Sequence, residues 1–518
     1  MQPLPLPVAF LVAGIGGILT NAAFPYLSWW WAAIVGLALL LLALHGARPP
    51  RGFLIGLIWG FAFFAPLLSW SLVSVTGHWL PWFALSLSQA AFIAVFGMIY
   101  AFIVRRKIGA GREPIAGAFL WVAIEQLRMV VPFGGFPWGA LPHSQVSGPL
   151  LHLAPWGGTV VVGLVVAFAA AALAGVAINT ARPVASIVTV AVAAAIVAGA
   201  SLVPLPSSSP ETGTLDVALV QASVPERGAA WQSQGAEITS EYRALTEAWA
   251  VDGSADMVLW PESAADLDPR SHPGVEADVV AAQATVGVPI LFGTQRFPGD
   301  GTRLNEYLVW TEAGEAGSYA KQHPVPFGEY MPFRDFFRRL SPAVDRISTD
   351  MAAGTEPGVL DVYVVSLGRA VRVGVGICFE VAYDALIREN VDLGAEFLVI
   401  PTNNASFGYT QEAFQQRDMT RFRAVEYGRA AIQVATTGVS AVYSPSGEWL
   451  GGSPDKLYVQ WTGEVSIPLR SSATATEVMG DWPRIVLWVI AGLWLLAALA
   501  RPPLEPRRAP SERRKEKR

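Results

Sequence analysis

The chain has a single cysteine, Cys378, among 518 residues, and only 15% of its residues are charged. One cysteine excludes an intramolecular disulfide, and it cannot supply the several thiolates of a structural zinc site. The thiol is therefore either a small buried apolar group or a reactive nucleophile. The sequence also lacks a His/Cys/carboxylate cluster at ligand spacing and a GxGxxG pattern. We expect neither a metal nor another cofactor.

The scarcity of charge indicates a membrane protein, because soluble globular domains carry about 25% charged residues. Hydrophobic residues make up 53% of the chain. Apolar runs suited to membrane spans, which need about 20 residues, occur at 5–25, 28–45, 52–74, 83–104, 114–131, 158–178, 184–203 and 483–500. We predict an α-helical bundle of eight spans. The first run lacks a basic start and is followed at once by another span, so it does not resemble a cleaved signal.

Basic residues indicate which side of the predicted bundle faces the cytoplasm. They lie between alternate spans and after the last one, at Arg48, Arg51, Arg105, Arg106, Lys107, Arg112, Arg182 and in the tail 502–518. With eight spans all these places share one side, which the positive-inside rule assigns to the cytoplasm. We expect a seven-helix region at 1–204, a periplasmic domain at 205–480, an eighth helix at 481–501 and a basic cytoplasmic tail at 502–518. The tail is interpreted as a solvated, topology-fixing run, so no nucleic acid is expected as a partner. The predicted location is a bacterial inner membrane.

The segment after the Pro/Ser linker "PLPSSSPETG" differs from the predicted spans. Short Val/Ile/Leu-rich runs indicate strands at 215–224, 255–263, 288–295, 306–310, 371–378, 396–404 and 431–444. Amphipathic runs indicate helices at 238–251, 381–395 and 412–429. Apolar strands that alternate with helices predict an α/β domain, with a sheet covered by helices.

Polar residues at the ends of the predicted strands are candidates for a site, because sites in such folds form there. Glu262 ends "VLWPES", Cys378 ends "VRVGVGIC", and Asn403 and Asn404 end "EFLVIPTNN". A cysteine nucleophile needs a base for its proton and donors for the oxyanion. Glu262 is a candidate base.

Two further features bear on this chemistry. Lys321, in the loop "YAKQHPVPFGEYMP", and the backbone N–H of Phe379 are candidate oxyanion donors. A helix starting near Val381 is expected to lower the pKa of the Cys378 thiol. His323 is an alternative base, as in Cys–His hydrolases. Taken alone, a Glu after a strand is usually a cap or a surface ion pair, and a lone Lys is usually solvated.

The segments "LWPES", "YAKQHPVPFGEYMP" and "GICFE", in that order, resemble the nitrilase superfamily, which places a Glu–Lys–Cys triad on an αββα sandwich. Seven spans, such a domain and a last span are similar to the apolipoprotein N-acyltransferase family. The resemblance implies Glu262 as base, Lys321 as oxyanion-stabilising cation and Cys378 as nucleophile. It implies supporting roles for Glu329, Phe379 and Glu380. It also implies substrate contacts at Trp231, Phe407, Tyr330 and Asn404.

The function implied by this resemblance is acyl transfer. An acyl chain would move from a phospholipid such as phosphatidylethanolamine, through a thioester on Cys378, to the α-amino group of the S-diacylglyceryl cysteine of an apolipoprotein. The alternatives are a membrane-tethered amidase of nitrilase type and a non-catalytic membrane receptor with a nitrilase fold. The chain departs from residues common in the family at Ser406, Thr436 and Thr437.

The connection 131–158 lies on the predicted outer side and contains no Lys, Arg, Asp or Glu. Its Trp138 and Trp156 are expected at the membrane interface, where aromatic residues gather. The loop either packs on the spans there or contacts the substrate. Glu125 and Arg128, just before it, are one helical turn apart and are expected to pair with each other or with neighbours; contact with a lipid headgroup is the alternative.

Overall fold

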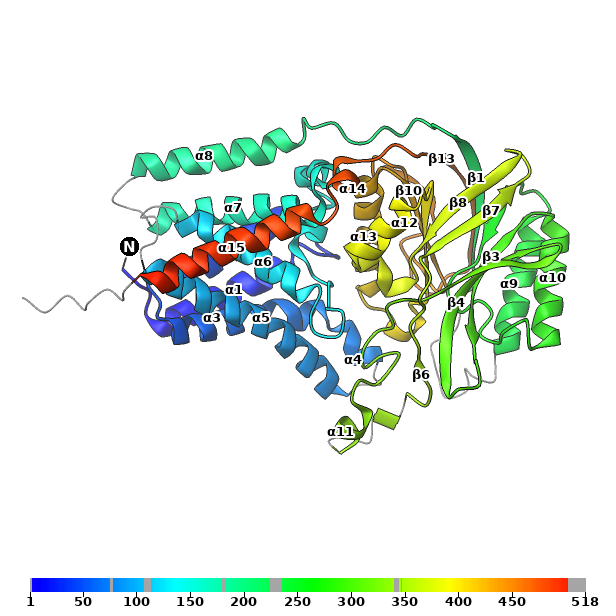
Figure 1. Ribbon diagram of the computed structural model, residues 1–518, viewed down its shortest axis with the longest axis horizontal. Helices are drawn as coiled ribbons and strands as arrows, with labels where there is room; N and C mark the ends of the chain where they lie inside the picture. Colours follow the sequence, from blue (N-terminus) through cyan, green and yellow to red (C-terminus); the bar gives the residue numbers. More distant parts are fainter. Residues whose placement is uncertain are drawn as a thin grey trace, which may run out of the picture.

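The computed structural model describes residues 2–74, 78–106, 113–178, 183–223, 235–339, 344–345 and 347–501. A helical bundle occupies one end of the molecule and an α/β domain the other (Figure 1). The long bundle helices are α1 (Leu6–Asn21), α2 (Trp30–Leu44), α3 (Pro49–Leu67), α5 (Trp79–Arg105), α6 (Glu113–Arg128), α7 (Gly158–Ile178), α8 (Pro183–Ala200) and α15 (Trp482–Ala500). Each falls on one of the predicted apolar runs.

The bundle helices differ in length and composition. Across the described ranges, four of them, α3, α5, α7 and α15, are long and apolar enough to cross a membrane. Helices α1 and α2 are apolar but shorter, and so is the searched part of α8, Ile187–Ala200. The eight-span arrangement therefore stays a prediction.

The third predicted span, 52–74, is interrupted in the structure. Helix α3 contains Pro66 and ends at Leu67, and a separate short helix, α4 (Trp70–Ser74), follows it. Proline near the end of a helix removes a donor and clashes with the preceding turn, which favours termination there. The chain after Leu67 thus bends toward the α/β domain, where α4 contacts the short 3₁₀ helix η6 (Ala405–Phe407).

The connection 131–158 differs from the expectation for an interfacial loop. It contains the 3₁₀ helices η1 (Leu141–Gln145) and η2 (Pro149–Trp156). Trp156 is half exposed, but Trp138 is only 2% exposed and lies inside the protein. The expectation for Trp138 was wrong because the α/β domain covers that part of the connection.

Glu125 and Arg128 are held by the same connection. Glu125 Oε1 accepts a hydrogen bond from the Leu141 N–H at 2.9 Å. Arg128 Nη1 donates to the carbonyls of Phe136 at 2.6 Å and Trp138 at 2.9 Å. The chain folds back over the end of α6, so its backbone supplies partners to both charged groups. Pairing with neighbours is confirmed.

The α/β domain contains two sheets in the described part of the chain. The first has the order β13-β1-β2-β3-β4-β5, with β6 beside β4. The second has the order β12-β11-β10-β9-β8-β7. The strands are β1 (Gly213–Gln221), β2 (Met257–Leu259), β3 (Ile290–Arg296), β4 (Thr302–Thr311), β5 (Gly314–Ala320), β6 (Asp350–Met351), β7 (Val359–Val364), β8 (Arg369–Val375), β9 (Phe397–Thr402), β10 (Ala430–Ala435), β11 (Ala441–Tyr443), β12 (Trp449–Gly452) and β13 (Trp461–Leu469).

The two sheets pack face to face, with helices on their outer faces. Alternation along β9 shows this: Phe397 and Val399 lie in the core between the sheets, whereas Leu398 and Ile400 face the other way. Helices α9 (Gly235–Trp249) and α10 (Pro273–Val286) cover the first sheet, and α12 (Asp384–Asp392) and α13 (Glu412–Tyr427) cover the second. The predicted αββα sandwich is therefore present, and its α12–α13 layer faces the helical bundle (Figure 1).

Several strands were not predicted, and others were predicted to be too long. The run 431–444 is two antiparallel strands, β10 and β11, because Gly438 turns the chain at φ +102°. Strands β5, β6, β7, β12 and β13 were missed. β5 has a mostly exposed, glycine-containing sequence, and alternate side chains of β7 are exposed, so neither forms a continuous apolar run.

Candidate active site

Lys321 is at the centre of a buried group of charges. It follows β5 directly, and its side chain is fully buried. Its Nζ lies 2.7 Å from Glu329 Oε1 and 3.9 Å from Glu262 Oε1. Burial alone would lower the pKa of Lys321, but the two carboxylates outweigh it and hold that pKa above its usual value. The lysine is a permanent cation between two glutamates.

Glu262 is held on both carboxylate oxygens. It comes three residues after β2, and its Oε1 accepts a hydrogen bond from Asn305 Nδ2 at 2.6 Å. Its Oε2 accepts from the backbone N–H of Asn403 at 2.8 Å. Glu329 is fixed in a similar way, since its Oε2 accepts from the Val325 N–H at 2.7 Å. Each carboxylate therefore has a defined direction relative to Lys321.

Cys378 occupies a strained position next to these charges. It follows β8 after a short connection, has φ +54°, and begins the single-turn 3₁₀ helix η5 (Cys378–Ala382). The residue is partly buried. A left-handed conformation is unfavourable for a non-glycine residue and turns the side chain out of the strand direction.

The ionisation of Cys378 differs from the sequence-based expectation. Burial and the charge of Glu262 raise the pKa of the thiol, while Lys321 lowers it, and the net shift is strongly upward. The expected helix near Val381 is only the single turn of η5, and α12 begins at Asp384. The resting group is thus a neutral thiol, and a base must remove its proton during a reaction.

Glu380 connects the loop after β5 with the turn that carries Cys378. It accepts hydrogen bonds from Tyr319 Oη at 3.0 Å and from the backbone N–H groups of Gln322 at 2.8 Å, His323 at 2.9 Å and Ile377 at 2.7 Å. Burial raises the pKa of Glu380 to about 7, against the opposing effects of Lys321 and these donors. Glu380 is therefore a positioning residue, because it holds the two segments against each other.

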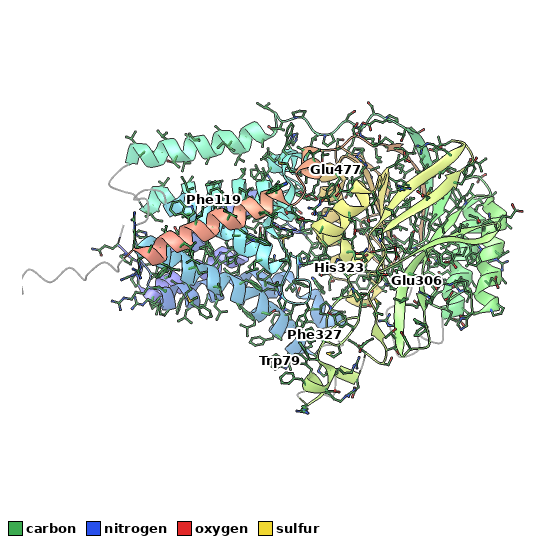
Figure 2. The ribbon with its side chains drawn as sticks, in the orientation of Figure 1. Trp79, Phe119, Glu306, His323, Phe327 and Glu477 are labelled. Carbon is green, nitrogen blue, oxygen red and sulfur yellow. The ribbon has the colours of Figure 1, made fainter. Side chains whose placement is uncertain are left out.

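His323 and Tyr330 lie in the loop that follows Lys321. The His323 ring stacks on the Tyr383 ring, with centroids 4.4 Å apart. Burial, and to a lesser extent the charge of Lys321, lowers the pKa of His323. His323 and Phe327 lie on the border between the sheets and the helical bundle (Figure 2). The Tyr330 carbonyl accepts from the Phe327 N–H at 2.8 Å, which closes the turn that contains Glu329.

The other expected substrate contacts have different surroundings. Asn404 is buried, and its Nδ2 donates to Glu412 Oε2 at 2.5 Å and Gln416 Oε1 at 2.8 Å. The Phe407 ring meets Trp70 of α4 edge-on, with centroids 5.1 Å apart. Trp231 lies outside the described residues.

One of the departures from the family sequence also reaches the site. Thr436 Oγ1 donates to Asn403 Oδ1 at 3.1 Å. Asn403 is the residue whose N–H holds Glu262. Thr436 thus supports the candidate base through its neighbour.

Phe379, the residue next to Cys378, packs against the helical part of the chain. The ring of Phe379 stacks on Trp138, with centroids 5.3 Å apart and planes 8° from parallel. Trp138 Nε1 donates to Gln415 Oε1 of α13 at 2.6 Å. Arg128 holds the Trp138 carbonyl, so α6 contacts the residue next to the cysteine through one intermediate side chain.

Sequence reasoning missed three polar residues of this site: Asn305, Tyr319 and Glu412. Asn305 and Tyr319 lie inside strands, where a polar residue usually faces solvent. Glu412 begins a helix, where an acidic residue is ordinarily a surface charge that complements the helix dipole. No spacing in the sequence distinguishes them: Asn305 and Tyr319 contact partners 43 and 61 residues away along the chain, and Glu412 contacts Asn404 across an irregular loop.

A buried lysine between two glutamates, beside a cysteine on an αββα sandwich, defines a protein of the carbon–nitrogen hydrolase class. The family model Carbon-nitrogen hydrolase matches residues 216–474, and the model Apolipoprotein N-acyltransferase N-terminal domain matches residues 16–172. The chain belongs to the apolipoprotein N-acyltransferase family.

Curated relatives support this assignment over nearly the whole length. The apolipoprotein N-acyltransferase of Mycolicibacterium smegmatis is 33% identical over 512 residues, which cover 93% of this chain and 83% of the relative. That of Geobacter metallireducens is 29% identical, with 95% of each chain covered. Among solved structures, an amidase of the nitrilase superfamily from Nesterenkonia AN1 has 15% identity and a TM-score of 0.39. It covers 55% of this chain and 99% of its own. This likeness is weak and says nothing about activity.

Proposed function

We propose that the chain is an inner-membrane N-acyltransferase that completes the acylation of lipoproteins. Its donor is a phospholipid of phosphatidylethanolamine type, and its acceptor is the α-amino group of the S-diacylglyceryl cysteine of an apolipoprotein. The observation that carries the proposal is the buried Lys321, in contact with Glu329 and Glu262, beside Cys378. Membership of the family supports it.

In the first half-reaction, Glu262 takes the proton of the Cys378 thiol as the sulfur attacks the ester carbonyl of the phospholipid. The carbonyl oxygen becomes an oxyanion, which Lys321 and the N–H of Phe379 stabilise. That N–H has no partner among the backbone hydrogen bonds of the described residues. Glu262 then gives its proton to the departing lysophospholipid oxygen, and an acyl thioester remains on the cysteine.

In the second half-reaction, the neutral α-amine of the acceptor attacks the thioester carbonyl. Lys321 and the N–H of Phe379 again stabilise the oxyanion. Glu262 takes a proton from the nitrogen and returns it to the sulfur as the C–S bond breaks. An amide forms and the thiol is restored. Because an amide is more stable than a thioester, this half-reaction runs downhill without a cofactor.

The location of the site suits substrates that stay in a membrane. Each CH₂ group drawn from an apolar environment into water costs about 0.8 kcal/mol, so a whole acyl chain cannot be extracted. The stack of Phe379 on Trp138 joins the α/β domain to the apolar helices. We propose eight spans, with residues 1–204 and 481–501 in the membrane, 205–480 in the periplasm and 502–518 in the cytoplasm.

The test is mass spectrometry of the purified enzyme in vesicles that contain phosphatidylethanolamine. We expect an acyl adduct on Cys378, and its transfer to a diacylated lipopeptide as an amide. Vesicles of an ether-linked phospholipid, which has no ester to cleave, are the matched control. Release of free fatty acid with no amide would identify an amidase. A wild-type enzyme that never acquires the adduct would refute the proposal.

Replacement of Trp138 tests whether the helical bundle holds η5, the turn that carries Cys378, in place. Trp138→Leu removes the ring that stacks on Phe379, so the Phe379 N–H and the sulfur lose their support. Small misplacements of reacting groups reduce rates by up to about 10²-fold, and we expect lysophospholipid release to fall by about tenfold or more. Trp138→Phe keeps a ring there and should be milder. Equal activity of the leucine and wild-type enzymes would show that the stack has no such role.

A further inference from the structure

Glu412 is a buried carboxyl group that the mechanism above does not use. It begins α13 and is 2% exposed. Its Oε2 accepts a hydrogen bond from Asn404 Nδ2 at 2.5 Å. Among the described residues, no Lys or Arg forms an ion pair with it. Other buried carboxyl groups of the domain have stronger partners. Glu426 pairs with Arg423 at 2.5 Å, and Glu380 accepts hydrogen bonds from four groups.

The absence of an ion pair at Glu412, within the described ranges, has a physical consequence. An ionised carboxylate away from water is costly unless a positive charge accompanies it. Burial and the charge of Glu262 raise the pKa of Glu412 to about 8, although the Asn404 hydrogen bond opposes the shift. Glu412 in turn raises the pKa of the Cys378 thiol. The hydrogen bonds connect the same groups: Asn404 donates to Glu412, and the N–H of the adjacent Asn403 donates to Glu262 Oε2. Glu412 is therefore joined to the candidate base through two neighbouring residues.

The second half-reaction requires a proton acceptor in addition to Glu262. An α-amine has a pKa of about 8, so near neutral pH the acceptor arrives mainly as an ammonium group. It must lose one proton before it can attack and another when the amide forms. The sulfur takes one of these protons, by way of Glu262. The other is surplus, and Glu262 cannot hold both.

We propose that Glu412 binds the ammonium group of the acceptor and takes its surplus proton. The ammonium group replaces the Asn404 amide as the hydrogen-bond donor to Glu412. Its positive charge favours the carboxylate, so the Glu412 proton leaves to solvent. One ammonium proton then passes to the carboxylate, which frees the nitrogen lone pair for attack on the thioester. The net result is one proton released per acyl group transferred. This inference rests on the proposed acyltransferase function.

The test compares the two half-reactions in Glu412→Gln. Glutamine keeps the shape and can still accept from Asn404, but it neither pairs with an ammonium group nor takes a proton. The enzyme is loaded with acyl groups from phosphatidylethanolamine and separated from the donor. It is then mixed with a diacylated lipopeptide between pH 6 and 9, and mass spectrometry follows the decay of the Cys378 adduct. At pH 6.5 we expect the second half-reaction to slow at least about tenfold more than the first, as expected for loss of a proton acceptor.

The pH dependence separates this role from a structural one. The deficit of the glutamine variant should shrink as the pH rises through the amine pKa of about 8, because the free amine then needs no acceptor. Glu412→Asp should restore part of the rate, and Glu448→Gln, the same change at an exposed site, should have no effect. A deficit that is equal in both half-reactions, or equal at every pH, would overturn the proposal. If the wild type forms no adduct, the proposed function itself fails, which is a distinguishable result.

Discussion

Replacement of Cys378 by alanine should abolish acyl transfer while the protein keeps its fold. The chain has no second thiol to take over, and hydroxyl nucleophiles are much weaker unless a base activates them. We expect lysophospholipid release and amide formation to fall by more than about 10³-fold, as for the loss of a catalytic nucleophile. The side chain is small and the residue is only partly buried, so the thermal unfolding midpoint should change little. Release of lysophospholipid, intact protein mass and thermal unfolding are the measurements.

Two controls sharpen this experiment. Cys378→Ser keeps an oxygen nucleophile and the shape of the turn, so a trace of an ester adduct is its expected product. Binding of ether-linked phospholipid, which cannot react, should be unchanged in the alanine variant. Persistent lysophospholipid release by that variant would mean that the acyl group is never carried on sulfur.

Replacement of Lys321 by methionine should reduce both activity and stability. The change removes the cation that would hold the oxyanion, and loss of one such donor costs about 10²–10³-fold in rate. It also leaves Glu329 and Glu262 without their positive partner in a buried place. Removal of one member of a buried ion pair costs about 3–5 kcal/mol in the free energy of unfolding. Thioester formation and denaturant unfolding measure the two effects separately.

The double variant Lys321→Met with Glu329→Gln separates the two roles of the lysine. Neutralising Glu329 removes one of the two uncompensated charges, so stability should partly return. Activity should not return, because the oxyanion still lacks its cation. If the double variant regains both, Lys321 has a structural role only.

Polar residues at strand ends are local features, so Glu262 and Cys378 could be picked out as candidates from the sequence, whereas the triad as a set came from the family resemblance. The structure brings Glu262 and Lys321 together, and the catalytic roles stay a prediction. The αββα architecture followed from the same strands and helices together with the resemblance. The edge strand β5 was missed because its exposed residues carry no apolar pattern. The burial of Trp138 was also missed, since it depends on a domain that contacts it from more than 200 residues away along the chain.

The electrostatics of the site were the least predictable part. A cysteine before a helical turn was expected to have a lowered thiol pKa, but desolvation and Glu262 outweigh the lysine. Glu412 gives no signal in the sequence, because its role depends on its having no ion pair among the described residues, which only the packing of α13 against the strand ends shows. The pKa of a buried group depends on the charges of all the residues packed around it, and these residues are distant from one another in the chain.

The pairing of β1 with β13 has a consequence for the origin and engineering of such proteins. These strands run antiparallel, with Gly213 opposite Leu469 and Gln221 opposite Trp461. The polypeptide therefore enters and leaves the sandwich at one corner, between α8 and α15. An ancestral free-standing hydrolase could be spliced between two helices at this corner without stretching either one. The same geometry makes the corner a natural place for grafting a related sandwich onto this bundle.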